Sequence, residues 1–217
     1  MNTIYLVNSV NLNLMPPPVK RRPTGHHHGD LRNALEKAAL ELVAEKGPHG
    51  FSLNEASRRA GVSVAAPYKH FADREALLAA LAVTGYRQQR ELFSAAVSGL
   101  DDPADQLSAF AAAYVRFAAE QPAFFDVTFY AGLDKSRHPE LAEAGDLLLA
   151  ALLPLAVSVA PDEAAAFDLL LRISSAAHGL AVFLRQGLFG VEADALDETA
   201  ERAARTARAI IAGVGGA

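Results

Sequence analysis

Residues 52–77 read SLNEASRRAGVSVAAPYKHFADREAL, and this stretch decides how the rest of the chain is interpreted. Two short amphipathic segments meet at Ala60-Gly61-Val62, and a longer helical pattern opens at Asp73. Ser52 and Ser63 are placed to cap the two short segments, because a Ser side chain can accept a free backbone N–H at a helix start. Two helices joined by a glycine-containing turn form a helix-turn-helix, whose second helix enters the major groove of DNA. The stretch therefore predicts a DNA-binding unit.

Charge is distributed unevenly along the 217-residue chain, whose formal net charge is −5. Residues 1–74 contain ten Lys or Arg against six Asp or Glu, a net charge of +4. Residues 75–217 contain ten against nineteen, a net charge of −9. This division indicates that the N-terminal third faces phosphate, while the acidic remainder avoids nonspecific contact with DNA.

The absence of cysteine excludes several kinds of site. Without Cys the chain cannot form disulfides, thiolate metal sites or Cys nucleophiles, which suits a reducing cytosol. The first 14 residues lack a basic region and a small-residue cleavage site, so we expect no signal peptide. No stretch reaches the roughly 18 uninterrupted apolar residues that a membrane-spanning helix requires. We therefore expect a cytoplasmic protein without a membrane partner.

Helical periodicity covers most of the chain, and no strand alternation is evident. Residues 15–29 combine prolines, glycines and a Lys20-Arg21-Arg22 run, and residues 1–29 are interpreted as a flexible N-terminal arm. The basic run is either a solvated tail or a minor-groove contact. A helix-turn-helix domain is predicted over 30–76, with Asp30 capping its first helix, and a helical ligand-binding and dimerisation domain over 77–217. The predicted fold is all-α, with about nine helices.

The span from HHHGDL at His26 to Leu77 resembles the DNA-binding domain of TetR-family transcriptional regulators. Members have a capped helix, then Ala-Gly-Val-Ser, then Tyr-x-His-Phe, then a charged pair and Leu. Each piece is present: Ala60 to Ser63, Tyr68, His70-Phe71, Arg74-Glu75 and Leu77. Farther along the chain, Ala177-His178-Gly179-Leu180 resembles a subgroup with a His-Gly signature. The resemblance implies a homodimeric regulator that binds a double-stranded DNA operator and a small effector.

Pro67 departs from the family pattern, which usually has an aliphatic residue before the Tyr. Proline lacks a backbone N–H and disfavours helical geometry at Ala66, so we expect the recognition helix to begin irregularly. Val64, Ala65 and Ala66 can only touch thymine methyl groups. Direct readout should therefore be sparse and depend on Lys69 and on DNA shape.

Eight residues are predicted to contact DNA. The Tyr68 hydroxyl suits a phosphate, and Lys69 suits a guanine or a phosphate. Arg74 could reach a phosphate, but a plain surface role is equally compatible with the sequence. Ser52 and Ser63 place free helix N-terminal amides where phosphate binds well. The full predicted set is Ser52, Ser63, Ala65, Ala66, Tyr68, Lys69, His70 and Arg74.

Aromatic residues concentrate at 110–130, within the acidic region. Core packing is their ordinary role, but the resemblance implies a ligand cavity, for which Phe117, Phe129 and His178 are the predicted contacts. A lone His in an apolar helix is more often a hydrogen-bonded core residue, and that alternative stays open. Because charged residues are few here, we expect a neutral or singly charged apolar or aromatic effector. The cavity should lie between helices at 104–120, 138–159 and 162–186.

The predicted helices at 162–186 and 194–212 carry long apolar faces that should form a symmetric four-helix dimer interface. These faces comprise Leu169, Ile173, Ala177 and Leu180 on the first helix, and Ala200, Ala203, Ala207 and Ile210 on the second. The predicted function is a repressor that binds a palindromic operator as a homodimer and is released by its ligand. A ligand-independent repressor, or an activator of the same fold, remains an alternative.

A small all-α enzyme or a metal-binding protein is the alternative from another class. The chain has no His-Glu-x-x-His motif and no Gly-rich phosphate loop. His26-His27-His28 are adjacent on an expected loop, and adjacent histidines cannot easily share one metal face. We therefore expect no enzyme activity, no metal site and no cofactor.

Overall fold

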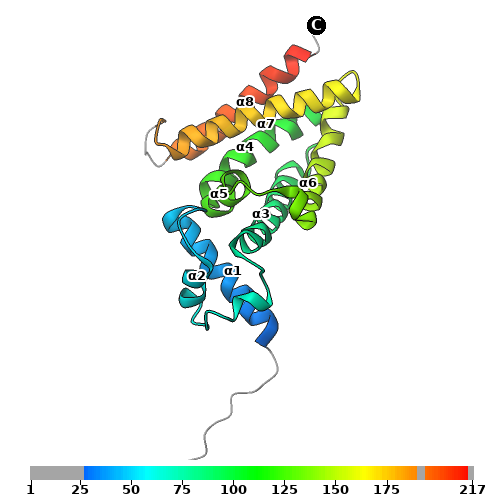
Figure 1. Ribbon diagram of the computed structural model, residues 1–217. Coiled ribbons are helices and arrows are strands. Elements are labelled where there is room, and N and C mark those ends of the chain that lie inside the picture. Colours follow the sequence, from blue (N-terminus) through cyan, green and yellow to red (C-terminus); the bar gives the residue numbers. More distant parts are fainter. Residues whose placement is uncertain (1–26, 190–193, 215–217) are drawn as a thin grey trace, which may run out of the picture.

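The computed structural model describes residues 27–189 and 194–214, and every regular element within them is helical. Eight α-helices and two 3-10 helices follow one another along the chain (Figure 1). Their bounds are α1 His27–Lys46, α2 Leu53–Arg59, η1 Pro67–Lys69, α3 Arg74–Val97, α4 Pro103–Glu120, α5 Pro122–Tyr130, η2 Lys135–Arg137, α6 Pro139–Val157, α7 Glu163–Arg185 and α8 Ala195–Val214. The predicted all-α fold is confirmed, and the expected count of about nine helices is close.

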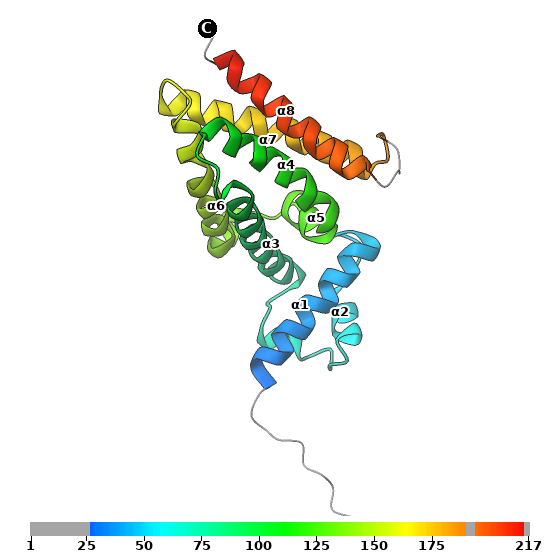
Figure 2. The ribbon, with the colours of Figure 1, turned by 180° about the vertical axis from the view of Figure 1, so that it is seen from behind.

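Two units share one long helix. Figures 1 and 2 show α1 and α2 at one end of the molecule, with α4, α7 and α8 crossing at the other. Between them, α3 packs against α1 and also against α4, α5 and α6. α3 follows directly after the segment that contains η1, so it connects the small N-terminal unit to the larger helical bundle.

Short polar side chains begin several of the helices by accepting a backbone hydrogen bond. Ser52 Oγ accepts from Glu55 N at 3.2 Å and Asp73 Oδ1 from Ala76 N at 2.8 Å, as their sequence positions predict for α2 and α3. α1 ends at Lys46, and the next residue, Gly47, has a φ of 74°, in the left-handed region that favours glycine. Local chemistry therefore sets these boundaries before any tertiary contact is considered.

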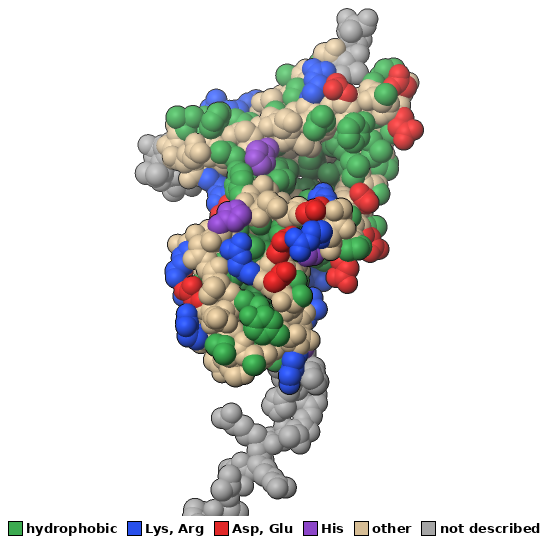
Figure 3. Space-filling model, viewed as in Figure 1, with side chains coloured by type: hydrophobic (Ala, Val, Ile, Leu, Met, Phe, Trp, Pro, Cys, Tyr) green, Lys and Arg blue, Asp and Glu red, His purple; other side chains and the backbone are tan. Residues whose placement is uncertain are grey.

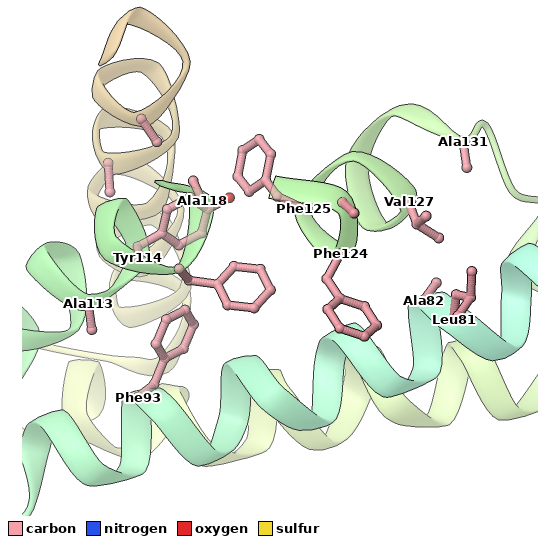
Figure 4. Packing of buried hydrophobic residues seen from close by; sticks show 14 of the residues in the cluster. Leu81, Ala82, Phe93, Ala113, Tyr114, Ala118, Phe124, Phe125, Val127 and Ala131 are labelled. Carbon is pink, nitrogen blue, oxygen red and sulfur yellow. The ribbon is translucent and has the colours of Figure 1, made fainter. Parts of the chain in front are cut away.

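Aromatic rings from three helices form the centre of the core (Figure 4). The Phe93 ring on α3 meets Phe110 on α4 edge to face, with 4.9 Å between ring centroids. Tyr114 on α4 meets Phe125 on α5 edge to face at 6.2 Å. Such pairs add stability beyond the area they bury. Most of the aromatic residues of this region therefore have the ordinary core role.

The first helix and the N-terminal arm differ from expectation. α1 begins at His27 rather than after Asp30, so Asp30 lies inside the helix and His27 and His28 are helical rather than on a loop. The first helical turn thus extends into the part of the chain that was expected to be an arm. The Lys20-Arg21-Arg22 run and the remainder of the arm lie outside the described residues.

The apolar faces predicted to form the dimer interface are mostly buried within one protomer. Leu169, Ile173 and Ala177 of α7 are buried, and so are the three alanines of α8 that were assigned to the interface. These faces pack where α7 and α8 cross α4 and each other. These residues were wrongly assigned to the interface, because sequence periodicity identifies an apolar face but not the helix that covers it; a dimer contact through α7 and α8 stays a prediction. Among the described helices, α7 alone is long and apolar enough to cross a membrane, although its packing is that of a bundle helix.

Candidate DNA-binding surface and ligand cavity

Ion pairs fasten α2 to α1. Arg59 donates through Nη1 and Nη2 to the two carboxylate oxygens of Glu45, at 2.5 and 2.7 Å, and Lys46 pairs with Glu55. The hydrogen bond from Arg59 lowers the pKa of Glu45, and the bond from Lys46 lowers the pKa of Glu55, so both carboxylates remain ionised at neutral pH. These ion pairs hold α2 against the C-terminal end of α1.

The recognition segment, residues 62–71, is irregular at its start. Residues 64–66 form a turn, and the only regular helix within the segment is η1, which spans Pro67–Lys69. The sequence position of Pro67 predicted this irregular start, and its side chain is buried. The predicted Ser63 cap is wrong, because η1 follows Ala66 without a side-chain cap and the Ser63 carbonyl instead accepts from Ala66 N at 3.0 Å. The proline moves the helix start three residues along the chain.

The segment exposes an aromatic and a basic side chain next to each other. Tyr68 is 59% exposed and Lys69 is also exposed, whereas Phe71 is buried beneath the guanidinium of Arg32, 5.2 Å from its ring centroid. Of the other predicted DNA contacts, Ser52, Ser63 and Ala65 are exposed, and Ala66, His70 and Arg74 are half-buried. Figure 3 shows hydrophobic side chains on this face of the N-terminal unit, with Lys and Arg around them.

Arg74 has a structural contact that the sequence did not reveal. Its Nη1 donates to the carbonyls of Pro48 and Phe51, at 2.9 and 3.3 Å, and its guanidinium lies 5.6 Å from the Phe51 ring centroid. The first turn of α3 is thereby bound to the turn that precedes α2. A DNA contact by Arg74 stays a prediction.

Two polar contacts join the N-terminal unit to the bundle, and we call them the tethers. In the first, Glu75 of α3 accepts from Arg137 Nη1 at 2.9 Å and lies 3.2 Å from His138 Nε2. In the second, His49 Nε2 lies 2.9 Å from the carbonyl oxygen of Tyr130, at the end of α5. Sequence reasoning found neither, because each joins residues more than 60 positions apart.

A cavity of about 340 Å³ opens between α3, α4, α6 and α7. It lies between the three helices expected from the sequence, and α3 supplies a further wall. Its apolar wall includes Phe93, Phe110, Phe129, Leu152 and Leu170. Its polar residues are Tyr86, Gln89, Tyr114, Lys135, Asp146 and Ser174. We call this space the ligand cavity.

The three predicted ligand contacts have different positions. Phe129 lines the cavity, but Phe117 is buried in the core and does not reach it, which corrects that assignment. His178 lies behind the wall, and its Nδ1 is 2.9 Å from the hydroxyl of Tyr114. Burial lowers the pKa of His178 and raises the pKa of Tyr114, so a neutral imidazole accepts the phenol hydrogen. His178 is therefore hydrogen-bonded, as the alternative from the sequence held, but it is half-buried at the edge of the core.

Gln89 is among the cavity residues that the sequence did not identify. It is 1% exposed, and neither its Oε1 nor its Nε2 has a hydrogen-bond partner. Its only sequence signal is a polar side chain at helical spacing between two aromatic residues, Tyr86 and Phe93. Among the described residues no cluster of His, Asp and Glu could hold a metal ion.

Two family models match the sequence. The model described as bacterial regulatory proteins, tetR family, matches residues 35–81, which contain α2 and the recognition segment. The model described as tetracyclin repressor-like, C-terminal domain, matches residues 107–207, which contain most of the bundle. No curated protein is significantly similar to the chain.

Solved structures share this fold over most of the chain. A protein of unknown function from Rhodococcus sp. RHA1 is 28% identical, with a TM-score of 0.72 over 88% of this chain and 99% of that one. A regulatory protein in the tetR family from Rhodococcus RHA1 is 20% identical, with a TM-score of 0.65 over 86% and 98% of the two chains. The TetR-family regulator PfmR from Thermus thermophilus is 22% identical, with a TM-score of 0.60 over 82% and 96%.

Proposed function

Because this chain belongs to the TetR family of transcriptional regulators, which bind DNA and are not enzymes, we propose that it is a homodimeric repressor released from its operator by a small apolar ligand. One observation carries the proposal. A single helix, α3, begins directly after the exposed recognition segment and also forms a wall of the ligand cavity. A ligand that moves α3 would therefore change the position of the residues that face DNA.

Tyr68 and Lys69 would lie at the centre of the DNA contact. Both are exposed, while the neighbouring Pro67 and Phe71 are buried and hold the segment against the N-terminal unit. A Tyr hydroxyl contacts phosphate oxygen well, and a Lys ammonium contacts phosphate or guanine. The exposed Val64 and Ala65 could meet thymine methyl groups in the major groove.

The outer face of α7 is the proposed dimer contact, in place of the buried faces assigned from the sequence. Leu171, Ser175, Gly179 and Phe183 follow one another at four-residue spacing and form one stripe, none of it buried. A Cβ added to Gly179 would meet nothing within 4 Å, so the protomer leaves this position open. Two copies packed through this stripe would bury its large apolar side chains symmetrically.

The two tethers suggest how a ligand would act at a distance. Phe129 lines the cavity, and the next residue, Tyr130, holds His49 of the N-terminal unit. Lys135 lines the cavity, and Arg137, two residues later, holds Glu75. A ligand that displaces either lining residue would disturb a tether. The two recognition segments of the dimer would then favour a separation that no longer matches the half-sites of the operator. Dimers of helix-turn-helix proteins require half-sites about 34–36 Å apart.

Two measurements test the proposal: binding to DNA and the oligomeric state in solution. Wild-type protein should shift DNA that flanks its own gene in a salt-dependent way and protect a palindromic site, and it should sediment as a dimer. Gly179→Glu should remain folded but become monomeric and lose operator binding, because the new side chain blocks the stripe. Gly213→Glu, also at an open helical position, is the matched control and should stay dimeric.

Three results would overturn parts of this function. A dimeric Gly179→Glu protein would refute the proposed dimer interface. Failure of the wild-type protein to bind any flanking DNA would refute the proposal of an operator beside its own gene. Operator binding that no apolar or aromatic compound releases would favour the ligand-independent regulator of the same fold.

A further inference from the structure

The side chain of Gln89 is buried without any hydrogen bond. The other buried polar side chains for which a bond is seen, Ser57 and Ser108, donate to the carbonyl four residues earlier in their own helices, at 2.9 and 2.7 Å. Gln89 instead leaves both Oε1 and Nε2 without a partner while it lines the ligand cavity. An amide buried without hydrogen bonds is destabilising, so a native protein retains one for a reason.

The walls around Gln89 form no hydrogen bond to its amide. Tyr86 lies about one helical turn before it on α3 and Phe93 about one turn after it, and the opposite wall is mostly aromatic and aliphatic. The Tyr114 hydroxyl is already bound to His178. Lys135 lies at the rim, with its ammonium 5.4 Å from the centroid of the Tyr86 ring. Since Gln89 forms no bond to these walls, an occupant of the cavity is an available partner for its amide.

We propose that Gln89 is the polar recognition group of the ligand cavity, and that the ligand is a neutral, mainly apolar molecule carrying an adjacent hydrogen-bond acceptor and donor, such as a carboxamide or a lactam. A primary amide presents its oxygen and its N–H side by side and pairs with the Gln89 amide through two hydrogen bonds. This inference rests on the proposed function, because it specifies the ligand of the same cavity.

The absence of charge beside Gln89 argues for a neutral ligand. A carboxylate could accept from Nε2, but it would lose its hydration at a position where no buried cation compensates for the loss. The charged lining residues, Lys135 and Asp146, are both exposed at the rim and opposite in sign. The apolar remainder of the cavity suits an aromatic or aliphatic body of drug-like size.

The experiment compares three probes that differ only in their polar end. They are 4-phenylbenzamide, the nearly isosteric 4-isopropylbiphenyl and the charged 4-phenylbenzoate, each titrated by calorimetry into full-length protein without DNA. Because each neutral hydrogen bond contributes a modest net stabilisation, the amide should bind roughly ten- to hundredfold more tightly than the isopropyl compound. It should also bind more tightly than the carboxylate.

Two variants identify the residue responsible. Gln89→Leu should bind the amide and the isopropyl probe equally or prefer the latter, and its unliganded Tm should rise by about 2–4 °C because the unpaired amide is gone. The neighbouring Gln88→Leu is the matched control, since Gln88 is half-buried on the same helix and does not line the cavity. It should retain the wild-type preference.

The outcomes separate this inference from the repressor function. Equal binding of amide and isopropyl probes to wild-type protein, an amide preference retained in Gln89→Leu, or binding by none of the three probes would overturn the role of Gln89. A Gln89-dependent amide preference without any effect on DNA would support this inference and refute ligand release. If these probes release DNA with equal potency from wild-type protein and from Gln89→Leu, ligand release is supported and the role of Gln89 is refuted.

Discussion

The recognition segment and the ligand cavity are built in opposite ways. The recognition segment is ten consecutive residues, 62–71, from a single stretch of the chain. The cavity collects side chains from Tyr86 to Ser174, contributed by six helical elements. A local motif can be identified in a single sequence, whereas a cavity exists only when distant helices have packed around it.

The N-terminal unit and the ligand cavity also differ in how their polar side chains are paired. In the N-terminal unit, Arg59 is paired with Glu45 and Arg74 with two backbone carbonyls. In the cavity, the buried amide of Gln89 has no partner. The N-terminal unit therefore pairs these side chains within the protein, whereas the cavity retains a buried polar group that an occupant could satisfy.

The largest expected effect is a loss of unfolding free energy when a side chain is removed from the core beside the cavity. Phe125 is 0% exposed, so Phe125→Ala should lower the free energy of unfolding by about 3–5 kcal/mol. Phe167→Ala is the control, because Phe167 is 50% exposed at the cavity and should contribute far less. Urea denaturation measures both. Similar losses in the two variants would mean that the packed core and the cavity wall do not differ as described.

The recognition segment should respond in DNA affinity but not in stability. Lys69→Ala should weaken operator binding by about 1–3 kcal/mol and relax specificity at one position if Lys69 contacts a base. If it contacts phosphate, all sites weaken alike and the salt slope falls by about one. Tyr68→Ala should also weaken binding, and Arg205→Ala on the distant α8 controls for the loss of one positive charge. Unchanged affinity in both recognition variants would place the DNA contact elsewhere.

Arg74 tests whether the N-terminal unit is held together internally. Arg74→Ala removes hydrogen bonds to the carbonyls of Pro48 and Phe51, so it should lower the free energy of unfolding by about 1–2 kcal/mol. The matched control is Arg58→Ala, at an exposed position of α2. Loss of DNA affinity with wild-type stability would instead identify Arg74 as a phosphate contact.

The smallest expected effect is a pH dependence from His178. Burial lowers its pKa in the folded protein, so the unfolded chain binds the proton more readily. This contribution to stability is fully present above the unfolded pKa of about 6.5 and is lost as pH falls through the lowered folded pKa. His178→Gln keeps an acceptor for Tyr114 and should flatten the change in unfolding free energy between about pH 7.5 and 5.5. An equally steep change in the variant would assign the dependence to other groups.

Sequence patterns predicted the N-terminal unit well because its signals are local. The caps at Ser52 and Asp73 were correct, since a cap depends on a side chain and an amide three residues apart. Pro67 predicted the irregular turn correctly. The Ser63 cap was wrong because the same proline moved the helix start beyond the reach of that side chain.

The sequence predicted the location of the cavity, but only some of the residues that line it. Phe129 and Phe117 both lie in the aromatic region, yet only Phe129 faces the cavity. Which side of a helix meets a cavity, a neighbouring helix or solvent depends on how the helices cross. Sequence spacing does not contain that information.

The sequence by itself determined the all-α class, the capped helix-turn-helix and the family, because these depend on side chains that act within a few residues of one another. Only the tertiary structure decided which apolar faces are buried, where Arg74 and Glu75 find their partners, and that Gln89 lines a cavity with its amide unpaired. Those outcomes depend on the packing of helices far apart in the chain. Burial and hydrogen-bond partners are properties of that packing, not of any one segment.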